Sequence, residues 1–247
     1  MLVNERSQPK PWSALQRDAT NLGTDGQGRL HVEGVRWDIV NNADGSAREE
    51  GVFGDAYVNP DGLKDIYLAI KPFTNKPGGY PGHAQLHFEF RPDSPVTDSQ
   101  GHSDRELVLS VEVHFRQGEN YEPGGQDPDP IVYQLGTGSD AVEKATLYHH
   151  YPLELYKLNL NQDQKVALLR ERVSAATLDH TQDIYHPTKN SCLSTLIDGV
   201  NLVVPEKQQI SHSDPKAKIP VWCPKVFKKY DLVFSTEPDL TIPAVPK

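Results

Sequence analysis

The sequence of 247 residues has only two cysteines and one methionine. Two cysteines cannot build the multi-disulfide framework of a small secreted domain, although a single Cys192–Cys223 bridge stays open. No hydrophobic run approaches the roughly 20 residues of a membrane-spanning helix, so no transmembrane segment is predicted. Acidic residues (34) outnumber lysine and arginine (25), and the net charge is -9. Because there is also no basic stripe with interleaved aromatic residues, no nucleic-acid partner is predicted.

The first residues, MLVNERSQPKPW, mix acidic and basic side chains and lack the apolar core of a secretory signal. Two alternatives for the compartment therefore stay open: a cytoplasmic protein, or the mature or truncated form of an exported one. Nothing in the sequence indicates an oligomeric state.

Turn-forming residues are abundant, with 20 prolines and 18 glycines. Such a composition favours short elements and a β-rich or α+β fold over a helical bundle. We expect an irregular N-terminal arm (1–27), one α+β domain (28–204) and an extended Pro/Lys-rich C-terminal segment (205–247) packed on that domain. The expected architecture is an antiparallel sheet packed with a few helices.

Two segments have the alternation of half-buried strands. In GHAQLHFEF, Leu86, Phe88 and Phe90 share one face, and in ELVLSVEVHF every second residue from Leu107 to Phe115 is apolar. We expect these two strands to be antiparallel neighbours, joined by the long polar connection between them. Further strands are predicted in the segments RLHVEGVRWDIV, LKDIYLAIKPF, IVYQL and ATLYHHYPLEL.

The periodicity becomes helical in NQDQKVALLRERVSAATL, for which Asn161 is the expected N-cap. A second, shorter helix is predicted from Cys192 to Gly199. Its N-cap would be Asn190 or Ser191, and Gly199 would end it.

Cys192 would lie in the first turn of that second helix. There the unpaired backbone N–H groups and the helix dipole favour a thiolate, and the same N–H groups could stabilise an oxyanion. The alternative interpretation is a buried structural cysteine, since free cysteine is often buried.

A cysteine nucleophile needs a base, usually histidine, oriented by a third polar group. His83 would lie at the rim of the sheet, whereas His87 and His114 lie on strand faces shared with acidic residues. Glu112 interrupts the apolar run, so it is either exposed to solvent or paired with a histidine or a cation. Three further histidines in polar contexts are predicted to be solvated: His102, His180 and His212.

A metallohydrolase using His83, His87 and Glu89 is a third interpretation. Four residues along a strand span about 13 Å, however, which is too far for two ligands of one ion. The sequence therefore predicts no metal site, and it implies no cofactor.

Taken together and in order, several segments resemble the bacterial family described as the Lnb N-terminal periplasmic domain, a domain of unknown function. These segments, which run from about Leu30 to Asn201, are VEGVRWDIV, GHAQLHFEF, ELVLSVEVHFRQGENY, YPLELYKLNLNQDQKVALL and YHPTKNSCLSTL.

The resemblance implies a permuted papain-like cysteine enzyme, whose histidine strand precedes an Asn-Cys helix. The family cysteine falls on Cys192, its histidine on His83 and its glutamate on Glu112. Asn190 matches the first of two paired asparagines and Tyr185 the leading tyrosine of the last block. The family also suggests the periplasm or cell envelope as the location.

Two positions depart from the family pattern: Ser191 replaces the asparagine before the cysteine, and His114 replaces a residue that is more often arginine.

From the resemblance and the position of Cys192 we expect a cysteine-dependent hydrolase or acyltransferase with an acyl-enzyme mechanism. Its substrate would be an amide or ester of a small molecule, lipid or peptide, including cell-envelope or lipidated substrates. The alternative is a non-catalytic binding or scaffold domain with the same fold.

Overall fold

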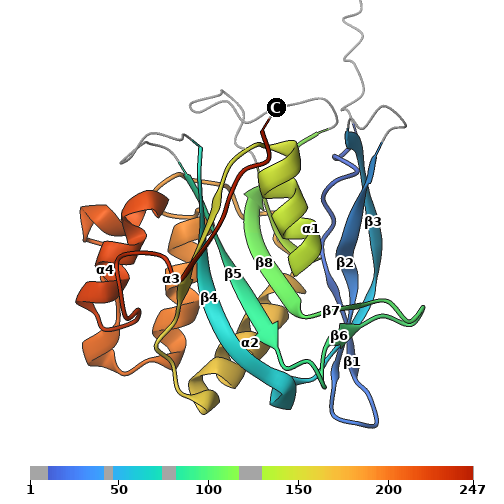
Figure 1. Ribbon diagram of the computed structural model, residues 1–247, viewed down its shortest axis with the longest axis horizontal. Helices are drawn as coiled ribbons and strands as arrows, with labels where there is room; N and C mark the ends of the chain where they lie inside the picture. Colours follow the sequence, from blue (N-terminus) through green and yellow to red (C-terminus); the bar gives the residue numbers. More distant parts are fainter. Residues whose placement is uncertain (1–10, 42–46, 74–81, 117–129, 247) are drawn as a thin grey trace, which may run out of the picture.

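The computed structural model of the protein describes residues 11–41, 47–73, 82–116 and 130–246. Within these residues the strands form one large mixed sheet with helices packed on it, an α+β fold (Figure 1). The strand order is β11-β10-β4-β5-β8-β9-β2-β3-β6-β7, with β1 also paired to β2. The α+β prediction is thus confirmed.

The sheet is built from strands of very different length. They are β1 (Thr20–Thr24), β2 (Leu30–Asn41), β3 (Ala47–Val58), β4 (Leu63–Pro72), β5 (Gly82–Phe90), β6 (Val96–Thr97), β7 (Ser103–Asp104), β8 (Glu106–Val113), β9 (Ile131–Thr137), β10 (Leu153–Lys157) and β11 (Leu240–Ile242).

The helices lie mainly in the second half of the chain. The α-helices are α1 (Gly138–Glu143), α2 (Gln162–Ala176), α3 (Cys192–Val203) and α4 (Cys223–Lys229). The short helices are η1 (Pro60–Gly62), the π-helix η2 (Lys144–Tyr148), η3 (Glu206–Gln208), η4 (Pro215–Lys218) and η5 (Pro220–Trp222).

The predicted pairing of the two strongest strands is confirmed. β5 and β8 are antiparallel, with Gln85 opposite Ser110, and β4 lies on the other side of β5, with Lys71 opposite His83. Only β2 and β9 pair in parallel among the described strands. The ladder between β5 and β8 ends at Gln85 and Ser110, whereas β5 stays paired to β4 as far as Gly82.

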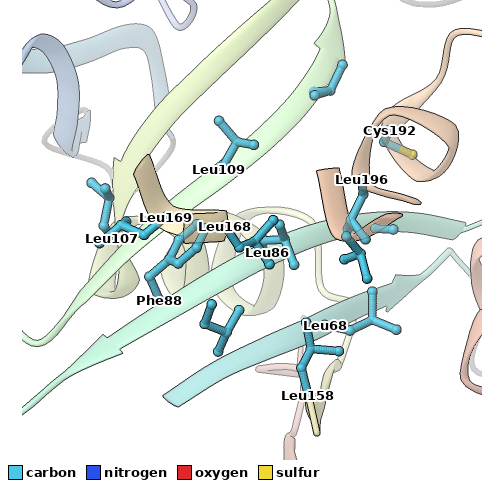
Figure 2. Packing of buried hydrophobic residues seen from close by; sticks show 14 of the residues in the cluster. Leu68, Leu86, Phe88, Leu107, Leu109, Leu158, Leu168, Leu169, Cys192 and Leu196 are labelled. Atoms are coloured by element: carbon cyan, nitrogen blue, oxygen red, sulfur yellow. The ribbon is translucent and has the colours of Figure 1, made fainter. Parts of the chain in front are cut away.

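The two faces of the central strands differ in chemistry. One face carries Leu86, Phe88 and Leu109, which belong to a large buried apolar cluster with α2, α3 and α4. Figure 2 shows Leu68, Leu86 and Leu109 of three neighbouring strands in this cluster, and Cys192 at the start of α3. The opposite face lies under α1 and η2 and carries polar side chains.

The first predicted helix begins as its sequence indicates. The Asn161 side chain accepts a hydrogen bond from the backbone N–H of Gln164, whose own side chain accepts from the backbone N–H of Asn161. This reciprocal capping box pairs two N–H groups that the helix itself leaves unpaired.

The second predicted helix is longer than expected. It does not end at Gly199 but continues to Val203. A side chain at Gly199 would lie 2.5 Å from the Arg172 guanidinium of α2. Glycine therefore allows two helices to approach closely here and does not act as a helix stop.

Three segments differ from the predicted secondary structure. In ATLYHHYPLEL only Leu153–Lys157 is a strand, because helix α1, capped by the Thr137 side chain, runs directly into η2. The 205–247 segment is not purely extended: the buried side chains of Val226 and Phe227 lie on α4. In the N-terminal arm, Thr20–Thr24 pairs with β2, and residues 1–10 lie outside the described residues.

The end of the ELVLSVEVHFRQGENY segment, from residue 117 onward, also lies outside the described residues. In the ranges that the structure covers, no helix combines the length and the apolar character needed to cross a membrane.

Candidate active site

Cys192 is the first residue of α3 and belongs to the apolar cluster (Figure 2). Its exposed fraction is only 6%. Burial raises the pKa of the thiol to about 11, although hydrogen bonding to backbone N–H groups of Ala84 and Leu193 acts in the opposite direction. The helix terminus therefore does not produce the expected resting thiolate, because the cost of burying a charge outweighs it.

Ser191 caps the helix that carries Cys192. Its hydroxyl accepts from the backbone N–H of Ser194, and the Ser194 hydroxyl accepts from the backbone N–H of Ser191. Asn190 does not cap the helix: its side-chain amide donates to the carbonyl of Ile184, which closes the preceding turn. Of the two residues predicted as possible N-caps, Ser191 is therefore the one that caps the helix.

His83 is the second residue of β5, and its ring nitrogen Nε2 lies 2.6 Å from the Ser110 hydroxyl of β8. Burial, together with the charges of Lys71 and Lys144, lowers the pKa of His83, and Glu112 opposes this effect. The ring is therefore neutral at pH 7 and can accept a proton.

Glu112 is paired and not simply exposed to solvent. Both of its carboxylate oxygens lie 3.0 Å from the Lys144 ammonium of η2, and Oε1 accepts a hydrogen bond of 3.0 Å from Ser110. Burial alone would raise the pKa of Glu112, but the neighbouring positive charges outweigh it and hold the pKa well below its usual value. The carboxylate is therefore ionised at neutral pH.

Lys71 adds a second ammonium group to this face. It is 8% exposed, and its Nζ lies 3.0 Å from His149 Nδ1. Burial and the charge of Lys144 lower the pKa of Lys71 to about 8. A buried amine with such a pKa loses its proton far more readily than a surface lysine.

A bidentate ion pair joins β2 to α1 beside these groups. Arg36 Nε and Nη2 donate to both carboxylate oxygens of Asp140 at 2.9–3.1 Å, and both residues are buried. A cavity of about 20 Å³, large enough for a water molecule, lies between this pair and the Glu112 group. We call Lys71, Ser110, Glu112 and Lys144 the polar cluster.

The strand alternation separates the two predicted catalytic side chains by face. His83 shares its face with Gln85 and the polar cluster, whereas Ala84 shares the opposite face with Cys192. The two faces meet where the β5–β8 ladder ends, one residue from Ala84. Among the described residues, no hydrogen bond joins the Cys192 sulfur to a histidine ring. The structure thus brings Cys192 to the backbone next to His83.

Two other predicted residues lie apart from the polar cluster. His114 stacks on Trp12 of the N-terminal arm, with ring centroids 4.1 Å apart, and burial lowers its pKa. Tyr185 is partly buried and packs against the apolar cluster, away from the polar face. Both therefore contribute packing in this structure.

The residues of the metal interpretation have separate partners. His87 is fully buried and its Nδ1 lies 2.7 Å from Glu106, while Glu89 pairs with Lys64 and Arg105. Within the described ranges, no three histidine, cysteine, aspartate or glutamate side chains are grouped as metal ligands.

The disulfide that the sequence left open is not formed in this structure. Both cysteines, Cys192 and Cys223, are free and buried.

Two of the three histidines predicted to be solvated, His102 and His212, are exposed. His180 is not: it is 8% exposed, its ring stacks on Tyr133, and its nitrogens bond to Asp183 and to the Ala175 carbonyl. A short polar loop can thus bury a histidine if both ring nitrogens find partners.

The family model described as the Lnb N-terminal periplasmic domain matches residues 52–228, well over half of the chain. The chain belongs to this family. The match to the Lnb N-terminal periplasmic domain includes His83, Ser110, Glu112, Lys144 and Cys192. It begins after the VEGVRWDIV segment and extends beyond Asn201 into α4, so it is shifted toward the C-terminus relative to the resemblance noted in the sequence. No curated protein and no solved structure matches the chain significantly.

Sequence reasoning missed several members of this candidate site. Ser110 could have been found, because residues 110 and 112 of one strand must point to the same face. No local sequence pattern indicated the other members, because they come from strands and helices far apart in the chain. These are Arg36, Lys71, Asp140 and Lys144.

Proposed function

We propose that the protein is a cysteine-dependent hydrolase or acyltransferase on a permuted papain-like fold. Its substrate would be an amide or ester, and a cell-envelope or lipidated molecule would be consistent with the periplasmic description of the family. Location in the periplasm or envelope is part of the same proposal.

The proposal rests on one observation above all. Cys192 begins a capped helix, and its sulfur is hydrogen-bonded by the N–H of Ala84, the residue that follows His83 in β5. A thiol, a neutral imidazole and the N–H groups of a helix start are the three components that cysteine acyl transfer needs.

In the proposed reaction His83 takes the thiol proton of Cys192 as the sulfur attacks the carbonyl carbon. Because burial keeps the thiol protonated in the free enzyme, the proton transfer to His83 and the attack of the sulfur on the carbonyl carbon are coupled, and no thiolate forms beforehand. The first-turn N–H groups of α3 bind the oxyanion. The leaving amine or alcohol takes the proton from His83, and water or an amine acceptor then releases the acyl group and regenerates Cys192.

A non-catalytic binding or scaffold domain is the second candidate. It is favoured by the 6% exposure of Cys192 and by its membership of the apolar cluster. In such a domain the thiol would contribute packing alone.

Acylation by an activated ester separates the two candidates. The chain would be incubated with a p-nitrophenyl ester of a fatty acid, and the mass of the intact protein would be measured. We expect one acyl group on the wild type and none on Cys192→Ala. The matched control is Cys223→Ala, which removes the other buried thiol and should still be acylated.

Circular dichroism and the thermal midpoint would establish that each variant is folded. Equal acylation of Cys192→Ala and wild type would contradict the cysteine mechanism. A folded wild type that stays unmodified, while its cysteines react with a thiol reagent after unfolding, would favour the binding domain.

A further inference from the structure

We propose that Ser110 is a positioning residue that fixes His83 in the tautomer with its proton on Nε2, so that Nδ1 is the atom that accepts a proton. Glu112, held by Lys144, determines the direction of the Ser110 hydroxyl. The inference rests on the proposed function only in assigning the Cys192 thiol as the source of the proton that Nδ1 accepts.

The four groups form a continuous chain of short contacts. His83 Nε2 lies 2.6 Å from Ser110 Oγ, which lies 3.0 Å from Glu112 Oε1, and Lys144 Nζ lies 3.0 Å from both oxygens of Glu112. Ser110 is 5% exposed, and the side chains of Glu112 and Lys144 are 17% and 16% exposed. Partial burial strengthens such bonds and limits competition from water.

The proton positions follow from what each group can donate. An ionised carboxylate only accepts hydrogen bonds, so the bond between Ser110 and Glu112 must use the single hydroxyl hydrogen of Ser110. Towards His83 the Ser110 oxygen can then only accept. Nε2 must therefore carry the proton, and in a neutral imidazole this leaves the lone pair on Nδ1.

The strand geometry explains why a serine stands between histidine and glutamate. If the ladder continued, His83 would lie opposite Glu112, but it ends at the pair Gln85–Ser110. Beyond that point the two strands no longer bond to one another. Ser110 is the last residue of β8 that pairs with β5, and on the same face it bridges the neutral imidazole of His83 and the carboxylate of Glu112.

The charged groups that face His83 come from three elements packed around it. They are Lys71 of β4, Glu112 of β8 and Lys144 of η2. Their net effect with burial is to keep His83 neutral, and only a neutral ring has a tautomer to be fixed.

A second histidine of β5 provides an internal control. Nε2 of His87 lies 3.0 Å from the side-chain amide nitrogen of Gln85, and its Nδ1 lies 2.7 Å from Glu106. An amide nitrogen can only donate, so a neutral His87 must carry its proton on Nδ1. The two histidines should therefore show opposite tautomers in one spectrum.

Two-bond ¹H–¹⁵N correlation of the full chain labelled at histidine tests the inference at pH 7. The His83 signals are assigned by their loss in His83→Gln. We expect the Nε2–H form for wild-type His83, a mixture of tautomers for Ser110→Ala, and restoration of the single form in Ser110→Thr, which keeps the hydroxyl. His87 should show Nδ1–H in all three proteins.

Wild-type His83 protonated on Nδ1 would overturn the inference, as would a Ser110→Ala spectrum identical to wild type. If Ser110→Ala does not fold, the wild-type spectrum still decides, and Glu112→Gln provides the second variant. The Lys144 ammonium holds the amide oxygen of Gln, so the amide NH2 faces Ser110 and donates to its oxygen. The Ser110 hydroxyl can then donate to His83 Nε2, and we expect the Nδ1–H form to appear.

The acylation assay separates this inference from the proposed function. We expect Ser110→Ala to be acylated about tenfold more slowly than wild type, with recovery in Ser110→Thr. If the tautomers are as expected but Cys192→Ala and wild type are acylated equally, the positioning stands and the cysteine mechanism is wrong. If acylation depends on Cys192 but the tautomers are not as expected, the cysteine mechanism stands and the positioning role of Ser110 is wrong.

Discussion

The two faces of β5 and β8 give the same strands opposite properties. On one face Leu86, Phe88 and Leu109 pack with α2 and α3 into a dry cluster that includes Cys192. On the other, Ser110, Glu112 and Lys144 form a chain of hydrogen bonds around a small cavity. The proposed nucleophile and its proposed base therefore come from faces with different electrostatics.

This difference shows what each face contributes to a titratable group. The apolar face keeps a proton on Cys192, because the N–H groups of Ala84 and Leu193 offset only part of the cost of burying a charge. The polar face keeps Glu112 charged although it is partly buried, because Lys144 and other cations surround it.

The largest effect is expected at the buried ion pair of the polar face. Asp140→Ala leaves the Arg36 guanidinium buried without its partner and should lower the free energy of unfolding by about 4 kcal/mol. Urea denaturation measures this loss. In the matched double variant Arg36→Met/Asp140→Leu no charge is left unpaired, and most of the loss should disappear. A double variant as unstable as Asp140→Ala would show that the pair itself, and not the unpaired charge, determines stability.

The apolar face should respond to lost volume. Leu86→Ala opens a cavity in the cluster and should lower the free energy of unfolding by about 3 kcal/mol. The control is Leu202→Ala, at an α3 position that is 69% exposed, which should change the value by less than about 0.5 kcal/mol. Urea denaturation of both variants tests this, and a similar small change in both would contradict the assigned burial.

Lys71 is a buried charge whose removal should stabilise the protein. Since its folded pKa of about 8 lies below the ordinary lysine value of 10.5, burial disfavours its charged form in the native state. Lys71→Met should therefore raise the free energy of unfolding at pH 7, by about 3 kcal/mol.

The advantage of Lys71→Met should depend on pH with a definite sign. Between pH 8 and 10.5 the unfolded wild type binds more protons at Lys71 than the native one, so wild-type stability at this site rises with pH. The difference between variant and wild type should be constant below pH 8 and shrink above it. Both proteins contain the same two cysteines, so the contribution of cysteine titration cancels in the difference between variant and wild type. The matched control is Lys64→Met, which removes a half-exposed lysine of the same strand.

The smallest effect is expected at the cap of the cysteine helix. Ser191→Ala removes the acceptor for the Ser194 N–H and should lower the free energy of unfolding by about 1 kcal/mol. Ser213→Ala, in an exposed turn, is the control and should be neutral. If thermal denaturation shows no difference between the two variants, Ser191 does not stabilise the helix start.

Local patterns were sufficient to predict much of the fold. The alternation in GHAQLHFEF and ELVLSVEVHF predicted both strands and their pairing, because the strand period of two leaves only one way to bury Leu86 and Leu109 together. Asn161 predicted the first helix start, and Asn190 or Ser191 the second, since capping involves residues only three positions apart. The prediction that the helix ends at Gly199 was wrong. A glycine that ends a helix and a glycine that leaves space for a neighbouring side chain cannot be told apart in the sequence.

Local sequence patterns predicted the central strands and placed Cys192 at a helix start with His83 on an earlier strand. The environment of these two residues follows from the tertiary structure alone. Burial of the thiol depends on packing with β5, and the hydrogen-bond chain of His83 depends on Ser110 and on Lys144 of a helix predicted as a strand. Charges from distant segments interact through space, and no local pattern of residues encodes their distances.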